Sequence, residues 1–94
     1  MQLKYGDKFS IQSWMVTGLE LSGNELLVYA IIYRDSQWPD SRFTGSLSYL
    51  ASWLNVTKQT VLNILKRLVA KGLIKKFETI ENGVTFCEYQ CILE

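Results

Sequence analysis

The chain has 94 residues, of which 48% are apolar, so it can bury one modest core and forms one domain or part of a larger protein. It has no histidine and only two cysteines, too few ligands for a metal site, and it lacks a glycine-rich phosphate loop or a nucleophile motif. No apolar run approaches the ~20 residues of a membrane span, and the N-terminus lacks a signal-peptide core, so we expect a cytoplasmic, non-enzymatic domain without cofactor or metal.

Residues 1–20 predict an N-terminal arm or strand. Apolar and polar residues alternate in part from Phe9 to Val16, which favours a short strand or an extended arm. Its expected buried anchors are Phe9, Ile11 and Trp14.

The first helix is predicted over residues 22–37. Ser22 and Glu25 have the spacing of a capping box, in which each side chain bonds the backbone N–H of the other. The helix is apolar on nearly every side, so we expect it to be the central buried helix. It gives way near Ser36 to a loop that contains Pro39.

The second helix is predicted over residues 46–54, with Ser46 as its N-cap and Leu47 and Leu50 on its core side. Asn55 follows it directly. Asparagine tolerates the left-handed conformation that a tight turn between two helices often needs.

A third helix is predicted over residues 57–71, with Thr57 as its N-cap and Gly72 as the left-handed residue that ends it. At 100° per residue, one face is apolar and packs on the core. That face consists of Val61, Ile64, Leu65 and Leu68.

Residues 73–92 predict a hairpin, because two strand-forming runs flank the dipeptide Asn82-Gly83. On one strand Cys87 and Cys91 would lie about 13 Å apart, too far for a disulfide. The expected fold is α+β and mainly α: a winged helix-turn-helix, with a three-helix core and a C-terminal β-hairpin wing.

Most of the positive charge lies in one segment. From Arg42 to Phe77 the chain carries seven basic residues and no acidic one, so this segment is +7 while the rest of the chain is −6. Basic residues concentrated on one substructure are typical of a nucleic-acid-binding surface.

The same segment resembles winged-helix DNA-binding domains. The nearest likeness is the N-terminal domain of replication-initiator, or replisome-organiser, proteins of phages, plasmids and mobile elements of Gram-positive bacteria. The likeness covers roughly residues 9 to 80. It rests on Trp14, Leu21-Ser22-Gly23-Asn24-Glu25-Leu26-Leu27-Val28-Tyr29-Ala30, Gly45-Ser46, Tyr49-Leu50-Ala51, Trp53-Leu54, Val56-Thr57-Lys58, Thr60-Val61, Leu65, Leu68 and Lys71-Gly72-Leu73-Ile74. It implies DNA binding in replication initiation or transcription regulation, and nucleoid association when DNA is bound. An initiator of this kind would continue into a second domain after the last strand, and the sequence leaves open whether this protein extends beyond Glu94.

The third helix has a face suited to the DNA major groove. Gln59 and Asn63 can donate and accept at a base edge at once, and Arg67 can pair with guanine or clamp a phosphate. Lys58 lies in the first turn, beside N–H groups that favour phosphate. The predicted DNA-binding residues are Ser46, Ser48, Lys58, Gln59, Thr60, Asn63, Lys66, Arg67, Lys71, Lys75 and Lys76.

Two features depart from the family pattern. Leu62 and Val69 widen the apolar arc of the third helix; either the N-terminal arm or the last strand covers them, or they form a self-association patch of a homodimer. The hairpin carries Glu78, Glu81 and Glu88, which phosphate would repel, so its tip is expected to add little to DNA affinity or to serve a protein partner.

The alternative to DNA binding is a winged-helix protein-interaction module that has kept the fold without the DNA. The expected partners are therefore double-stranded DNA, a second copy of the chain, or replication and transcription proteins.

Overall fold

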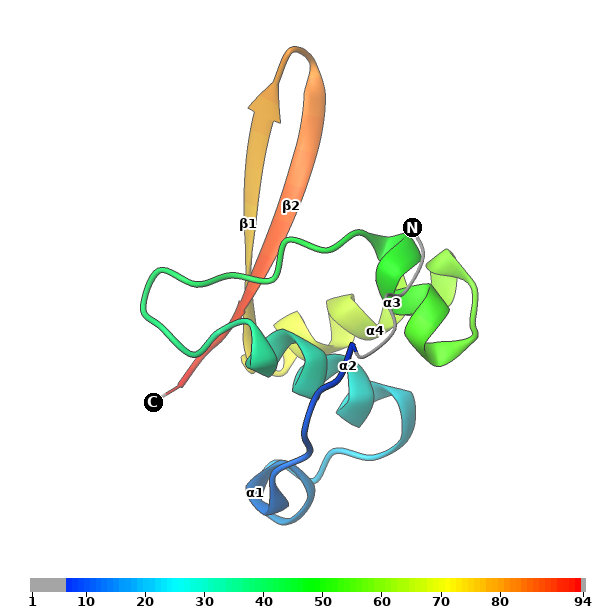
Figure 1. Ribbon diagram of the computed structural model, residues 1–94, viewed down its shortest axis with the longest axis vertical. Helices are drawn as coiled ribbons and strands as arrows, with labels where there is room; N and C mark the ends of the chain where they lie inside the picture. The colour runs from blue at the N-terminus through cyan, green and yellow to red at the C-terminus, as the bar shows by residue number, and fades with distance from the viewer. Residues whose placement is uncertain (1–6, 94) are drawn as a thin grey trace.

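The computed structural model describes residues 7–93 of the chain. The helices and strands within them are α1 (Ser13–Thr17), α2 (Gly23–Arg34), α3 (Leu47–Leu54), α4 (Lys58–Ala70), β1 (Ile74–Glu81) and β2 (Val84–Cys91). The helices gather at one end of the molecule, and the β1–β2 hairpin projects well beyond them (Figure 1). The predicted fold class, a mainly helical winged helix-turn-helix, is confirmed. No helix in the described range is both long enough and apolar enough to cross a bilayer.

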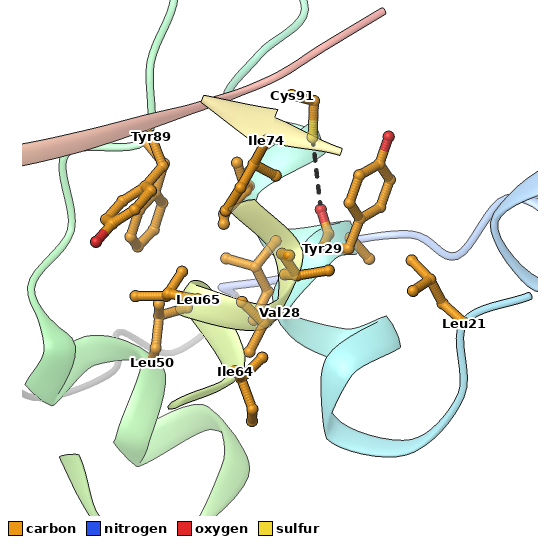
Figure 2. Close-up of a cluster of buried hydrophobic side chains, with 14 of the residues drawn as sticks. Leu21, Val28, Tyr29, Leu50, Ile64, Leu65, Ile74, Tyr89 and Cys91 are labelled. Carbon is orange, nitrogen blue, oxygen red and sulfur yellow. Dashed lines mark hydrogen bonds between the residues drawn. The ribbon is translucent and has the colours of Figure 1, made fainter. Parts of the chain in front are cut away.

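α2 is the central helix of the core, as predicted. Its residues Val28–Ile32 are five consecutive buried positions. A helix can be buried on every side only if other elements cover every side, and α1, α3, α4 and β2 all pack against it. Figure 2 shows Leu50 of α3, Leu65 of α4 and Tyr89 of β2 among the side chains that gather around Val28.

α2 ends at Arg34, three residues before the predicted boundary, because side chains bind the carbonyls of its last turn. The Ser36 hydroxyl donates to the Ile32 carbonyl at 2.7 Å, and the Gln37 side-chain amide donates to the Tyr33 carbonyl at 2.6 Å. The same carbonyls accept the backbone N–H groups of Asp35 and Ser36, at 3.1 and 3.0 Å, so the last turn is closed by short bonds that do not continue the helix. The buried Ser36 hydroxyl also accepts from the backbone N–H of Cys91, which ties the end of α2 to β2.

The helix-turn-helix forms as predicted, through two side-chain caps and one left-handed residue. Ser46 Oγ accepts from the Tyr49 N–H, and Thr57 Oγ1 accepts from the Thr60 N–H, each at 3.1 Å. Asn55 adopts φ 54° and ψ 47° in the turn. The observed α3 and α4 lack only the cap residues that the predicted ranges included.

α4 ends in the left-handed residue predicted for it. Gly72 has φ +74°, and its N–H donates to the Val69 carbonyl while the Leu73 N–H donates to the Leu68 carbonyl. These two bonds make the Schellman arrangement, which satisfies carbonyls that the helix leaves open. The chain then reverses directly into β1.

The hairpin turns at Asn82 (φ 51°) and Gly83 (φ 79°), the pair of positive φ angles that a type I′ turn requires. Its base is buried through Ile74, Tyr89 and Cys91, whereas residues 78–86 are exposed. Both cysteines are free, as predicted, and burial raises the pKa of the Cys91 thiol to about 11.

The N-terminal prediction is wrong in part. No strand forms over residues 9–16; residues 13–17 are the short helix α1, which buries Met15 beneath α2. Of the three expected anchors, Ile11 and Trp14 are exposed, and Phe9 packs edge-on against Trp53 at 4.9 Å between ring centroids. A strand needs a neighbour for its backbone groups, and none lies beside this segment in the described chain. The part of the arm within residues 1–6 lies outside the described residues.

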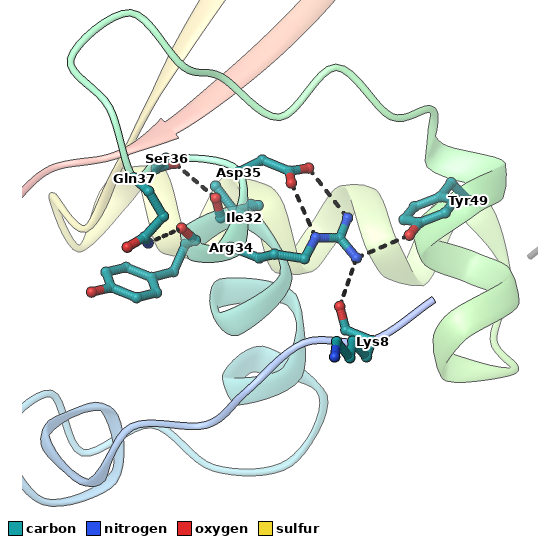
Figure 3. A network of polar contacts seen from close by, with 8 residues as sticks. Lys8, Ile32, Arg34, Asp35, Ser36, Gln37 and Tyr49 are labelled. Atoms are coloured by element: carbon teal, nitrogen blue, oxygen red, sulfur yellow. Dashed lines mark hydrogen bonds and ion pairs between the residues drawn. The ribbon is translucent and has the colours of Figure 1, made fainter. Parts of the chain in front are cut away.

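Arg34 joins three segments at the C-terminal end of α2, which sequence reasoning missed (Figure 3). Its guanidinium pairs with Asp35 through two nitrogens, at 3.0 and 3.2 Å. The same group donates to the Lys8 carbonyl of the N-terminal segment and to the Tyr49 hydroxyl of α3, each at 3.1 Å. The network therefore fixes α3 relative to α2.

We expect Tyr49→Phe to lower the free energy of unfolding by about 1–2 kcal/mol, because it removes a hydrogen bond from a charged, partly buried donor. Urea denaturation measures the change. Tyr33→Phe is the matched control, since the Tyr33 hydroxyl makes no hydrogen bond within residues 7–93. Equal losses in the two variants would contradict a bracing role for the Arg34 network.

Candidate nucleic-acid interface

α4 presents one polar stripe to solvent because its opposite face is fully buried. Val61, Ile64, Leu65 and Leu68 are buried as predicted, and they fix the rotation of the helix about its axis. The exposed residues directly opposite, here called the α4 stripe, are Gln59, Asn63, Lys66 and Ala70. This stripe holds amides, one cation and one small side chain, and no acid.

The two amides of the α4 stripe hydrogen-bond to each other. The Gln59 side-chain N–H donates to Asn63 Oδ1 at 3.0 Å, across one helical turn. The side-chain oxygen of Gln59 and the side-chain NH2 group of Asn63 are not used in this bond. The pair therefore still offers an acceptor and a donor to a ligand. Side-chain amides with both functions can match the N6/N7 edge of adenine.

Lys66 and Lys58 are the basic residues of α4 that form no ion pair within the described residues. Lys58 lies in the first turn, whose N-cap Thr57 already satisfies the Thr60 N–H. The Thr60 hydroxyl is also engaged, at 3.0 Å from that of Thr57. Lys66 therefore supplies the positive charge of the α4 stripe, and Lys58 that of its N-terminal end.

Arg67 and Lys71 lie on a different flank of α4, where Glu25 of α2 binds both. Arg67 Nε is 3.3 Å from Glu25 Oε2, and Lys71 Nζ bonds Glu25 Oε1. The Glu25 side chain is 16% exposed, against 57% and 49% for its partners. The structure thus does not bring Arg67 into the α4 stripe.

The hydrogen bond from Lys71 has the largest effect on the pKa of Glu25 and lowers it. Burial raises this pKa, the hydrogen bond from Arg67 lowers it further, and the net shift is downward. Glu25 is therefore ionised at neutral pH, and the three groups together carry +1 rather than the +2 of two free cations. The predicted capping box is wrong for the same reason. Ser22 occupies the N-cap position without a side-chain bond, and Glu25 turns to α4 instead.

The first turn of α3, the middle of α4 and the hairpin enclose a hollow of about 340 Å³. Ser46 and Leu47 contribute from α3, Leu62 from α4, and Lys76 and Phe86 from the hairpin. Ser46 Oγ is occupied as an acceptor by its cap bond but can still donate its hydroxyl proton. Ser46 and Lys76 therefore lie beside one flank of α4. Ser48, the residue after Leu47 in α3, is half-buried.

Leu62 and Val69 have different surroundings. Leu62 is half-buried and faces the last strand across this hollow, whereas Val69 remains 39% exposed. Self-association through these two residues stays a prediction.

Two acidic residues of the hairpin pair with basic residues, one of them from the loop before α3. Arg42 lies over the Phe77 ring at 3.6 Å and pairs with Glu88 at 3.3 Å, and Lys76 lies 3.9 Å from Glu78. Lys75 points to the other face of the sheet, into a hollow that no α4 residue lines. Lys75 is therefore separated from the other predicted DNA-binding residues.

Residues 19–74 match the model of a family described as a helix-turn-helix domain. The match covers α2, α3 and α4 and more than half of the chain, and it stops before most of the hairpin. No curated protein matches the sequence. A helix-turn-helix domain supports DNA as a partner.

Proposed function

Because the chain belongs to the helix-turn-helix domain family, we propose that it binds double-stranded DNA with the α4 stripe in the major groove. The observation that carries the proposal is the acid-free stripe of amides and one lysine, aimed away from the core by four buried side chains. A groove about 12 Å wide admits one such helix, and Ala70 lets the backbone approach closely.

The side chains of this surface fall into base-reading and phosphate-binding groups according to their chemistry. Asn63 and Gln59 read base edges, since they alone in the stripe combine donor and acceptor. Lys66 and Lys58 contact phosphates, which hold the helix in register without reading sequence. Ser46, at the first turn of α3, anchors the phosphates of the other strand, with Ser48 and Thr60 as supporting hydroxyls.

Arg67 and Lys71 contribute less to DNA affinity than two free cations would. Their shared partner Glu25 must give up hydrogen bonds, or share them, before either cation meets a phosphate. The acid thus lowers the general, charge-driven part of binding while leaving the amide readers untouched. Because Glu25 weakens binding to every duplex alike, the base contacts account for a larger share of the binding free energy.

The proposed process is replication initiation of a mobile element or transcription regulation, in the cytoplasm and at the nucleoid when DNA is bound. Its support is the resemblance of residues 9 to 80 to replication-initiator domains.

A protein-interaction module without DNA binding is the second candidate. It is favoured by the exposed apolar residues near the hairpin tip, Ile80, Val84 and Phe86, which lie among glutamates rather than lysines. A wing that entered the minor groove would be expected to carry basic residues.

DNA affinity should fall steeply with salt. If Lys58 and Lys66 alone neutralise phosphates, the log–log slope in fluorescence anisotropy with labelled duplex should be about −2, and it should approach about −4 if Arg67 and Lys71 also do so. Lys66→Ala should reduce the magnitude of the salt slope by about 1 for every sequence. Asn63→Ala should reduce the difference in affinity between a selected and a scrambled duplex.

Lys8→Ala is the charge-matched control for this series. Lys8 lies in the N-terminal segment beside α2, so its loss should leave the slope unchanged. No binding to selected or random duplexes at about 50 mM salt would exclude DNA binding and favour the protein-interaction module.

Glu25→Gln should strengthen DNA binding at low salt by several-fold, because it frees Arg67 and Lys71 to meet phosphates. The gain should be the same factor for selected and scrambled duplexes, because phosphate contacts do not read sequence, so the ratio of their affinities should stay unchanged. Glu81→Gln removes the same charge from the hairpin tip and should change neither affinity. Equal effects of the two variants would mean that net charge alone, and not release of the cations, sets the affinity.

A further inference from the structure

Along the outer edge of β1, backbone N–H and C=O groups point away from β2. The hydrogen-bond pattern between β1 and β2 shows which residues carry them. The Ile92 N–H donates to the Leu73 carbonyl, so in this antiparallel register the residues of β1 that bond β2 are Lys75, Phe77, Thr79 and Glu81. The N–H and C=O groups that point outward therefore belong to Ile74, Lys76, Glu78 and Ile80. Among the described residues no strand pairs with this edge.

The corresponding edge of β2 is covered at its base. Phe43 and Tyr89 exchange two backbone hydrogen bonds there, at 2.7 and 3.1 Å, and the Cys91 N–H donates to Ser36. The base of the hairpin is therefore blocked on its β2 side, whereas the β1 edge has no strand partner among the described residues. Because the hairpin projects beyond the helices (Figure 1), its outer half can be reached by another molecule.

The charges along β1 are self-complementary. Lys75 and Lys76 lie near the base of the hairpin, and Glu78 and Glu81 lie toward its tip. An antiparallel second copy would run base against tip, so that its acids meet the lysines of the first copy. A strand edge is a template for pairing, and charged residues there usually prevent it unless each charge finds an opposite partner.

We propose that β1 pairs antiparallel with β1 of a second copy of this chain, about a two-fold axis at Phe77, to form a continuous four-stranded sheet. This register sets Lys76 opposite Glu78 of the second copy, and Glu78 opposite its Lys76. Both are residues with outward backbone groups, so each pair also exchanges backbone hydrogen bonds. The arrangement is isologous, as a two-fold dimer requires.

Neighbouring registers are disfavoured by charge. An axis at Lys76 sets two lysines opposite each other, and an axis at Glu78 sets two glutamates opposite each other. An axis at Thr79 pairs no opposite charges. Of these registers, the Phe77 register alone sets both charges opposite a partner of opposite sign.

This dimer differs from the patch predicted at Leu62 and Val69, and it does not depend on DNA binding. It would engage Lys76, which already lies 3.9 Å from Glu78 within one chain, in the pair between copies. The α4 stripe stays outside the paired edge, since none of its residues belongs to β1.

A charge-reversal series tests the register without DNA. Sedimentation equilibrium across a concentration series into the millimolar range should show wild type rising from the monomer mass to twice that mass. Glu78→Lys and Lys76→Glu should each raise the dimer dissociation constant at least tenfold, because they set like charges opposite each other. The double variant Lys76→Glu with Glu78→Lys should restore dimerisation. Circular dichroism verifies that each variant is folded.

Amide hydrogen exchange of wild type provides a readout that needs no variant. The amides of Lys76, Glu78 and Ile80 should exchange slowly at high concentration and rapidly on dilution, whereas those of Phe77 and Thr79 should be protected in both. A wild type that keeps the monomer mass throughout, single reversals that leave the mass unchanged, or a double variant that stays monomeric would each overturn the proposal.

Discussion

The burial of one face of α4 against α2 is the constraint on which the rest of the structure depends. Val61, Ile64, Leu65 and Leu68 are all excluded from water, and each contributes about 1.5–3 kcal/mol by its burial. Turning α4 about its axis would expose some of them, so the opposite face is fixed by apolar packing rather than by its own polar residues. The short turn at Asn55 then sets how α3 lies against that helix. A surface able to enter a groove is thus a consequence of what the core requires.

Electrostatics modify this surface through a residue of a different helix. Glu25 lies at the start of α2, yet it binds Arg67 and Lys71, which are separated from it by more than forty positions in the chain. Its pairs with half-exposed cations add little to stability, because solvent screens them. Their effect is on availability: Arg67 of α4 and its C-cap residue Lys71 are held by Glu25, whereas Lys58 and Lys66 of α4 form no ion pair in the described chain.

The features that could be predicted from the sequence are those set by the conformational preferences of one or two neighbouring residues. The caps at Ser46 and Thr57, the left-handed Asn55 and Gly72, and the Asn82-Gly83 turn each follow from the preferences of one or two residues, and all formed. The helical wheel also identified the buried face of α4. The contacts of Glu25 and Arg34 could not be predicted, because their partners come from other elements. For Glu25 the local capping pattern pointed to the wrong partner. Replacement of the expected N-terminal strand by α1 has a similar origin: burial of Met15 under α2 is a tertiary contact.

In the proposed complex the α4 stripe meets DNA while the hairpin tip does not. Titration of the isotope-labelled protein with duplex DNA, followed by NMR, distinguishes the two surfaces. The side-chain amide signals of Gln59 and Asn63 and the backbone signal of Lys66 should shift strongly, while the backbone signals of residues 80–84 should stay in place. Strong shifts at the hairpin tip with unchanged Gln59 and Asn63 signals would contradict the proposed complex.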